Sequence, residues 1–125
     1  MTAVVFIADD NPADVDLLLL AFEEAGMRAE FVIANDGLDA MRKLPACQPT
    51  LILLDIKMPG ADGFQVLAMI REDERLRSIP VTVMSSSSAP QDQQRSLDLG
   101  ANQYWVKPGR FQDLVRMVKG LAIVH

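Results

Sequence analysis

Short apolar runs alternate with amphipathic stretches along the whole chain. Three of these runs are almost free of polar residues, namely Ala3–Ala8, Leu51–Leu54 and Val81–Met84. Runs of this kind are typical of strands that are buried on both faces of a parallel sheet. Two more runs, Ala29–Ala34 and Gln103–Val106, are partly polar, and this composition predicts edge strands. The pattern therefore predicts a sheet of five strands.

A helix is predicted after each of the five strands. Asn, Asp and Pro indicate helix starts, whereas Gly or a following Pro indicates a helix end. The predicted helices run from Asn11 to Gly26, from Asp36 to Leu44, from Asp62 through Ile70, from Ala89 to Leu99 and from Phe111 to Ile123. Strands that alternate with helices predict right-handed βαβ units. The expected fold is a doubly wound α/β domain over residues 1–125, with helices on both faces of a parallel sheet.

The composition narrows the classes of function. The 125 residues include 12 Lys and Arg against 17 Asp and Glu, which gives a net charge of −5. This acidic balance argues against nucleic acid and against an anionic membrane surface as partners. The single cysteine, Cys47, predicts a reducing compartment, and the N-terminal residues do not resemble a signal peptide, so we expect the cytoplasm. The only histidine is His125, so sites that need histidine are excluded.

Three carboxylates follow two of the predicted core strands. Asp9 and Asp10 come directly after the first strand, and Asp55 comes directly after the third. Ligands of open α/β sheets bind outside the carboxyl ends of the strands, and neighbouring strands lie ~4.8 Å apart. If these two strands are neighbours, the three like charges share one pocket and need a cation to neutralise them. Oxygen ligands without sulfur or imidazole favour a hard divalent ion, above all Mg²⁺.

Two further residues at strand ends argue for a site rather than for three unrelated helix caps, which is the simplest role of a single aspartate there. Ser85 follows the fourth predicted strand, and Lys107 follows the fifth. A hydroxyl and an ammonium beside a carboxylate–metal cluster form a cradle for the three oxygens of a phosphoryl group. The sequence therefore predicts phosphoryl chemistry at the carboxyl edge of the sheet.

These residues belong to four motifs that together resemble the receiver domains of two-component response regulators. The motifs are Asp9-Asp10, Leu54–Gly63, Pro80–Ser85 and Lys107-Pro108, and the resemblance covers essentially the whole chain. It implies a flavodoxin-like fold with strand order 2-1-3-4-5. Because the last predicted helix ends near residue 123, we expect a stand-alone receiver domain with no output domain.

The resemblance implies a role for each residue of the site. Asp55 is the expected phosphoacceptor, which attacks the phosphorus of a phosphohistidine and forms an aspartyl-phosphate. Asp10 is expected to bind Mg²⁺ directly and Asp9 to bind it through a water molecule. Asp55 and the backbone carbonyl of Lys57 are the other expected metal ligands. Lys107 is expected to pair with the phosphoryl group.

The resemblance implies a switch as well. Ser85 is the hydroxyl that is expected to move to the phosphoryl group, and Tyr104 is the aromatic residue that is expected to rotate with it. The surface of the fourth helix, the fifth strand and the fifth helix should then change, so that partners or a second copy of the chain bind there. A cis peptide bond is also implied between Lys107 and Pro108, although only ~5% of X-Pro bonds in folded proteins are cis.

The expected phosphoryl donor is a sensor histidine kinase or a phosphotransfer protein. The stretches Asp10–Val15 and Ser85–Asp92 resemble stand-alone regulators that pair with phytochrome-type histidine kinases. The alternative is a phosphatase with an aspartate nucleophile, similar to the haloacid dehalogenase group. Those enzymes need a second aspartate two residues after the nucleophile, where this chain has Lys57, and usually a cap for which the chain has no room. A signalling module rather than an enzyme is therefore predicted.

Overall fold

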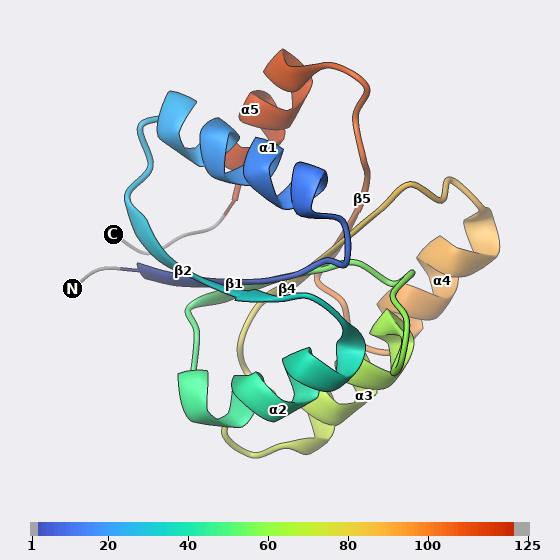
Figure 1. The fold of residues 1–125 in the computed structure, drawn as a ribbon. Helices are drawn as coiled ribbons and strands as arrows, with labels where there is room; N and C mark the ends of the chain where they lie inside the picture. The colour runs from blue at the N-terminus through green and yellow to red at the C-terminus, as the bar shows by residue number, and fades with distance from the viewer. Residues whose placement is uncertain (1–2, 122–125) are drawn as a thin grey trace.

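The sheet has five parallel strands, and the computed structural model describes residues 3–121 (Figure 1). The strands are β1 (Ala3–Ala8), β2 (Ala29–Ala34), β3 (Leu51–Leu54), β4 (Val81–Ser85) and β5 (Gln103–Val106). The helices are α1 (Pro12–Glu24), α2 (Gly37–Cys47), α3 (Gly63–Glu72), α4 (Pro90–Asp98) and α5 (Phe111–Lys119). Strands and helices alternate strictly, so the predicted α/β class is confirmed.

The strand order is β2-β1-β3-β4-β5, as the resemblance implied. The two partly polar runs form the two edge strands, which confirms that prediction. β1 and β3 are direct neighbours, with Ala8 paired to Leu54. The residues that follow these two strands therefore emerge side by side at one edge of the sheet.

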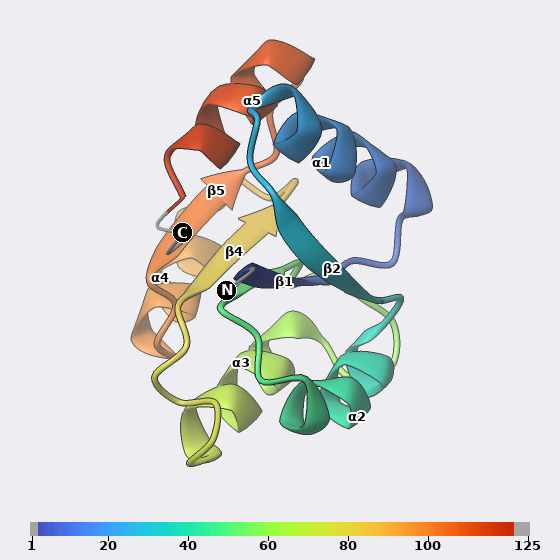
Figure 2. The same ribbon diagram turned by 90° about the vertical axis from the view of Figure 1, so that its left-hand side faces the viewer.

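Helices cover both faces of the sheet. α1 and α5 lie together on one face, and α2, α3 and α4 lie on the other (Figure 1; Figure 2). Strand side chains alternate between two apolar clusters: Phe6 and Ile52 pack toward α2 and α3, whereas Ile7 and Leu53 pack toward α1 and α5. Both faces of a core strand are thus buried, which explains why its sequence is apolar without alternation.

The predicted capping residues occur at the starts of the first and third helices. Asn11 caps α1, and its side-chain oxygen accepts the backbone N–H of Ala13 at 3.0 Å. Asp62 caps α3 in a reciprocal capping box with Gln65. Both caps satisfy backbone donors that the helix itself leaves free. They also fix where each helix leaves the carboxyl edge of the sheet.

Two predicted helix ends are wrong. α2 does not stop at Leu44 but runs on to Cys47, with Pro45 inside its last turn. Pro45 removes one helical hydrogen bond near the C-terminus, while the fully buried Leu44 anchors the same turn in the core. α5 ends at Lys119 rather than at Ile123; Ile123 and His125 lie outside the described residues. No helix within residues 3–121 is long and apolar enough to cross a membrane.

Arg71 ties the end of α3 to the loops that lead into β4 and β5. Its guanidinium donates to the carbonyl oxygen of Gly100 at 2.9 and 2.8 Å, and to those of Arg77 and Ile79 at 2.9 and 2.8 Å. It also donates to the side-chain oxygen of Asn102 at 2.9 Å, which in turn accepts the first N–H of β4. One planar cation thus fixes the N-terminal ends of both strands.

We expect Arg71→Ala to lower the free energy of unfolding by roughly 2–4 kcal/mol, because several carbonyl oxygens lose a charged donor at once. Urea denaturation followed by circular dichroism measures the change. Arg75→Ala is the matched control, since this exposed arginine pairs with Asp73 in the same turn and its loss should change the free energy of unfolding far less. Equal costs for the two variants would show that the Arg71 network carries no special stability.

Candidate functional site

The sheet itself holds the residues at the carboxyl ends of its strands. Asp9 donates its backbone N–H to the last carbonyl of β2 at 3.1 Å, and Asp55 donates to the last carbonyl of β1 at 2.9 Å. Lys107 donates in the same way to the last carbonyl of β4 at 2.8 Å. Each bond continues a parallel ladder by one residue. The three side chains therefore start from fixed backbone positions along one edge.

Asp9, Asp10 and Asp55 form the acidic cluster that the sequence predicts. One carboxylate oxygen of each residue lies within 4.8 Å of those of the other two. Asp9 and Asp55 are buried, whereas Asp10 is exposed, so the cluster opens to solvent on one side. All three offer hard oxygen ligands, which Mg²⁺ and Mn²⁺ prefer. The residues present thus fit a divalent metal site.

Two tight turns orient the buried carboxylates of this cluster. The backbone N–H of Asn11 donates to Oδ1 of Asp9 at 2.9 Å. The backbone N–H of Lys57 donates to Oδ1 of Asp55 at 3.0 Å, while the Lys57 side chain is exposed. Aspartate commonly accepts a backbone N–H two residues further on in such turns. The predicted role of the Lys57 carbonyl as a metal ligand stays a prediction.

Lys107 reaches the cluster from the end of β5, the edge strand that is separated from β3 by β4. Its ammonium nitrogen Nζ lies 3.0 Å from Oδ2 of Asp9 and 2.9 Å from Oδ2 of Asp55. A third partner, Oδ2 of Asp14, lies nearer still, at 2.7 Å. Asp14 lies in the first predicted helix, and no site was predicted to include it. The signal that could have indicated it is its spacing of four residues, one helical turn, from Asp10.

The pocket shifts the proton affinity of two of these groups upward. Burial raises the pKa of Asp9, although hydrogen bonds from Asn11 and Lys107 act in the opposite direction. Burial alone would lower the pKa of Lys107, but the carboxylates of Asp14, Asp55 and Asp9 outweigh it and raise that pKa. The two rises have different causes, because burial raises the pKa of Asp9 whereas the three carboxylate partners raise that of Lys107. Lys107 is therefore a cation throughout the physiological pH range.

Ser85 and Tyr104 both bond to Ser87, a residue for which no role was predicted. Ser85 is the last residue of β4 rather than the first after it, and it is fully buried. Its hydroxyl oxygen accepts the backbone N–H of Ser87 at 3.1 Å. The hydroxyl of Tyr104 donates to the carbonyl oxygen of the same Ser87 at 2.8 Å, and its half-buried ring packs against the core. Ser87 thus links the two predicted switch residues. The only sequence feature that could have indicated this role is the serine run Ser85–Ser88.

The predicted cis peptide bond between Lys107 and Pro108 is wrong for this structure, because residues 3–121 contain no cis peptide bond. The trans form is the ordinary preference of X-Pro bonds, by about 0.5–1 kcal/mol. Lys107 reaches all three of its carboxylate partners from this trans backbone. The site geometry therefore does not require the unusual isomer.

A family comparison agrees with this arrangement. Residues 5–119 match the model of the response regulator receiver domain. The chain belongs to this family. Receiver domains act in two-component signalling, as phosphoacceptors rather than as classical enzymes. The resemblance that the four motifs carried is thereby confirmed.

Individual relatives of this receiver domain cover most of its length. The response regulator Rcp1 of Synechocystis is 34% identical over 125 residues, which is 94% of this chain and 85% of Rcp1. The probable methanogenesis regulatory protein FilR2 of Methanothrix harundinacea is 34% identical over 93% of this chain and 79% of its own length. The DNA-binding transcriptional regulator RpaA of Synechocystis is 34% identical, and the receiver domain spans only 48% of it.

Solved structures of other response regulators share the fold of this receiver domain. The phosphorylated cyanobacterial phytochrome response regulator RcpA superposes with a TM-score of 0.89 and 37% identity, over 96% of this chain and 91% of RcpA. The Mn²⁺-bound form of Rcp1 gives a TM-score of 0.84 and 34% identity, over 94% of this chain and 90% of Rcp1.

We expect Mg²⁺ to stabilise the receiver domain, because a bound cation relieves repulsion among three clustered carboxylates. A concentration of 100 times the dissociation constant should add about 2.7 kcal/mol to the free energy of unfolding. Asp10→Asn should lose most of this gain without lowering the stability of the metal-free protein, since Asp10 is exposed. Thermal unfolding with and without Mg²⁺ measures both, with NaCl of equal ionic strength as the control. A melting temperature that Mg²⁺ does not change would argue against the metal site.

Proposed function

We propose that this receiver domain accepts a phosphoryl group on Asp55 in a reaction that depends on Mg²⁺, and that it passes the signal on through a changed surface. One observation above all supports the proposal. The ammonium of Lys107 and the carboxylates of Asp9 and Asp10 converge on Asp55 at the edge of the sheet. The donor is the phosphohistidine of a sensor histidine kinase or of a phosphotransfer protein.

The chemistry is nucleophilic substitution at phosphorus. A carboxylate oxygen of Asp55 forms the new P–O bond while the P–N bond of the phosphohistidine breaks, and the histidine nitrogen keeps the bonding electron pair. Lys107 pairs with the negative charge that gathers on the phosphoryl oxygens. Mg²⁺, when bound, supplies further positive charge at the same oxygens. Asp10 and Asp55, with the Lys57 carbonyl, would hold it directly, and Asp9 through water.

Two related response regulators support this chemistry indirectly. RcpA was solved in a phosphorylated form and Rcp1 in a Mn²⁺-bound form, and both share the fold with 34–37% identity. RcpA is a cyanobacterial phytochrome response regulator, which favours a phytochrome-type kinase as the donor for this receiver domain too. The phosphatase alternative gains no comparable support. Its general acid would have to be Lys57, whose side chain is exposed.

The signal then leaves through the surface formed by α4, β5 and α5. Ser85 moves toward the phosphoryl group and loosens its contact with Ser87, to which Tyr104 is also bonded. α4 is poised to respond, since Ser96 is its only buried residue. Leu97 on α4 and Val106 on β5 expose apolar side chains there, 46% and 37% respectively. Such side chains suit a partner or a second copy of the chain.

We expect Asp55→Asn to abolish phosphorylation, because the amide cannot act as the nucleophile. The readout is phosphoryl incorporation from acetyl phosphate or a cognate kinase, followed by intact mass spectrometry. Excess chelator should suppress incorporation into the unchanged protein. Asp62→Asn is a matched control, since this helix cap lies seven residues along the same loop, and it should label normally. Full labelling of Asp55→Asn, or labelling that ignores chelator, would refute the proposal.

For the switch, we expect Ser85→Ala to retain phosphorylation but to lose most of the phosphorylation-dependent change in partner binding or dimerisation. Tyr104→Phe should do the same, because it removes only the hydroxyl that bonds to Ser87. Ser88→Ala is the control, as this exposed serine belongs to the same run. Analytical ultracentrifugation with and without beryllofluoride measures dimerisation. If both variants respond fully, the signal leaves by another route.

A further inference from the structure

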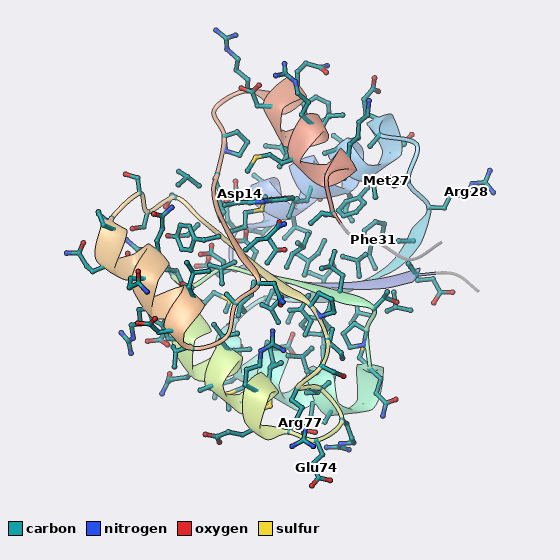
Figure 3. All side chains as sticks on the ribbon, turned by 180° about the vertical axis from the view of Figure 1, so that it is seen from behind. Asp14, Met27, Arg28, Phe31, Glu74 and Arg77 are labelled. Atoms are coloured by element: carbon teal, nitrogen blue, oxygen red, sulfur yellow. The ribbon has the colours of Figure 1, made fainter. Side chains whose placement is uncertain are left out.

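Asp14 gives the pocket a fourth carboxylate, which lies outside the acidic metal cluster. An ammonium group has three N–H donors, and Lys107 has three oxygen partners at 2.7, 2.9 and 3.0 Å. Asp14 provides the shortest of these contacts. Figure 3 labels Asp14 on α1, where the helix passes beside the segment that leads from β5 to α5. All three N–H donors of Lys107 thus have a partner, and one of these partners is Asp14 on α1.

A bound divalent cation would compete with Lys107 for its other two partners. Asp9 and Asp55 belong to the cluster whose oxygens lie within 4.8 Å of one another, and Asp14 does not. A cation in that cluster draws on the same carboxylates and repels the ammonium. Asp14 is then the one partner of Lys107 that the cation leaves free.

The surroundings give Lys107 little choice of another anion. Asp9, Asp14 and Lys107 line a cleft between α1, β4 and α5. The other side chains that line it are apolar, namely Leu17, Leu18, Met84, Pro108 and Leu114. An ammonium that lost Asp14 would face this apolar wall or leave for solvent. Leaving is open to it, because the side chain of Asp14 is itself 33% exposed.

We propose that Asp14 is a positioning residue that keeps the ammonium of Lys107 beside Asp55 when a divalent cation occupies the Asp9–Asp10–Asp55 cluster. This inference rests on the proposed function, since it needs the cluster to bind a cation. Without Asp14, Lys107 has to share Asp9 and Asp55 with the cation or move out. The cation is therefore bound less tightly, and Lys107 is less protected once the cation is bound.

The first test is the affinity for Mg²⁺ alone, measured by isothermal titration calorimetry at low ionic strength. Asp14→Asn should weaken binding about threefold to tenfold, because the pocket loses one negative charge that attracts the divalent ion. Asp14→Glu keeps the charge and should restore the affinity to within about twofold. Asp16→Asn removes the same charge from the exposed side of the same helix, and it should leave the affinity within about twofold of the original.

The second test follows Lys107 itself by reductive methylation and mass spectrometry. With saturating Mg²⁺, Lys107 should react slowly in the unchanged protein and several times faster in Asp14→Asn. The exposed Lys57 serves as the internal reference and should react equally in both. A residue that merely stabilised the start of α1 would alter the melting temperature but neither of these readouts.

The outcomes separate the two proposals. If the unchanged protein binds Mg²⁺ and is phosphorylated, but Asp14→Asn matches Asp16→Asn in affinity, the role of Asp14 is refuted and the proposed function stands. Methylation of Lys107 that stays slow in Asp14→Asn would refute it equally. If the unchanged protein binds no Mg²⁺, both proposals fail together.

Discussion

Four carboxylates gather at one edge of this sheet, and a single ammonium group pairs with three of them. Parallel strands deliver their carboxyl ends to the same side, so any acids that follow neighbouring strands are forced together. Burial of such charges is costly unless they are paired and hydrogen-bonded. Lys107 provides this pairing, because its ammonium contacts Asp9, Asp14 and Asp55 at once. The pairing of β5 with β4 is what places that lysine over the cluster.

The loop that follows Asp55 is packed tightly against neighbouring backbone. Gly63 starts α3 so close to β3 that a Cβ there would come within 2.3 Å of the Ile56 Cα and 2.4 Å of the Asp55 carbonyl oxygen. Gly37 meets the backbone of Ala61 in the same way. The loop after Asp55 is therefore clamped from two directions by backbone that cannot yield. A chemical change at Asp55 is therefore expected to move parts of the structure outside this loop.

Features that depend on a single short segment could be predicted from the sequence. The strand bounds Ala3–Ala8 and Leu51–Leu54 and the caps Asn11 and Asp62 follow from local composition, and the structure has them all. Contacts between distant side chains carry no such local signal. Arg71 binds carbonyls up to 29 residues away, and Asp14 meets a lysine 93 residues away. Pro45 misled the prediction because a proline is tolerated in a last turn that tertiary packing already anchors.

In contrast to the loop after Asp55, α4 is held mainly by polar contacts rather than by apolar packing. Its sequence is almost wholly polar, and Ser96 is its only buried residue. Asp92 accepts the hydroxyl of Ser87, and the Arg95 guanidinium stacks 4.1 Å from the centre of the Phe64 ring. Segments with few buried apolar contacts open at low free energy. With the loop after Asp55 clamped and the neighbouring helix lightly attached, the proposed phosphorylation would act most easily from Ser85 through Ser87 into α4.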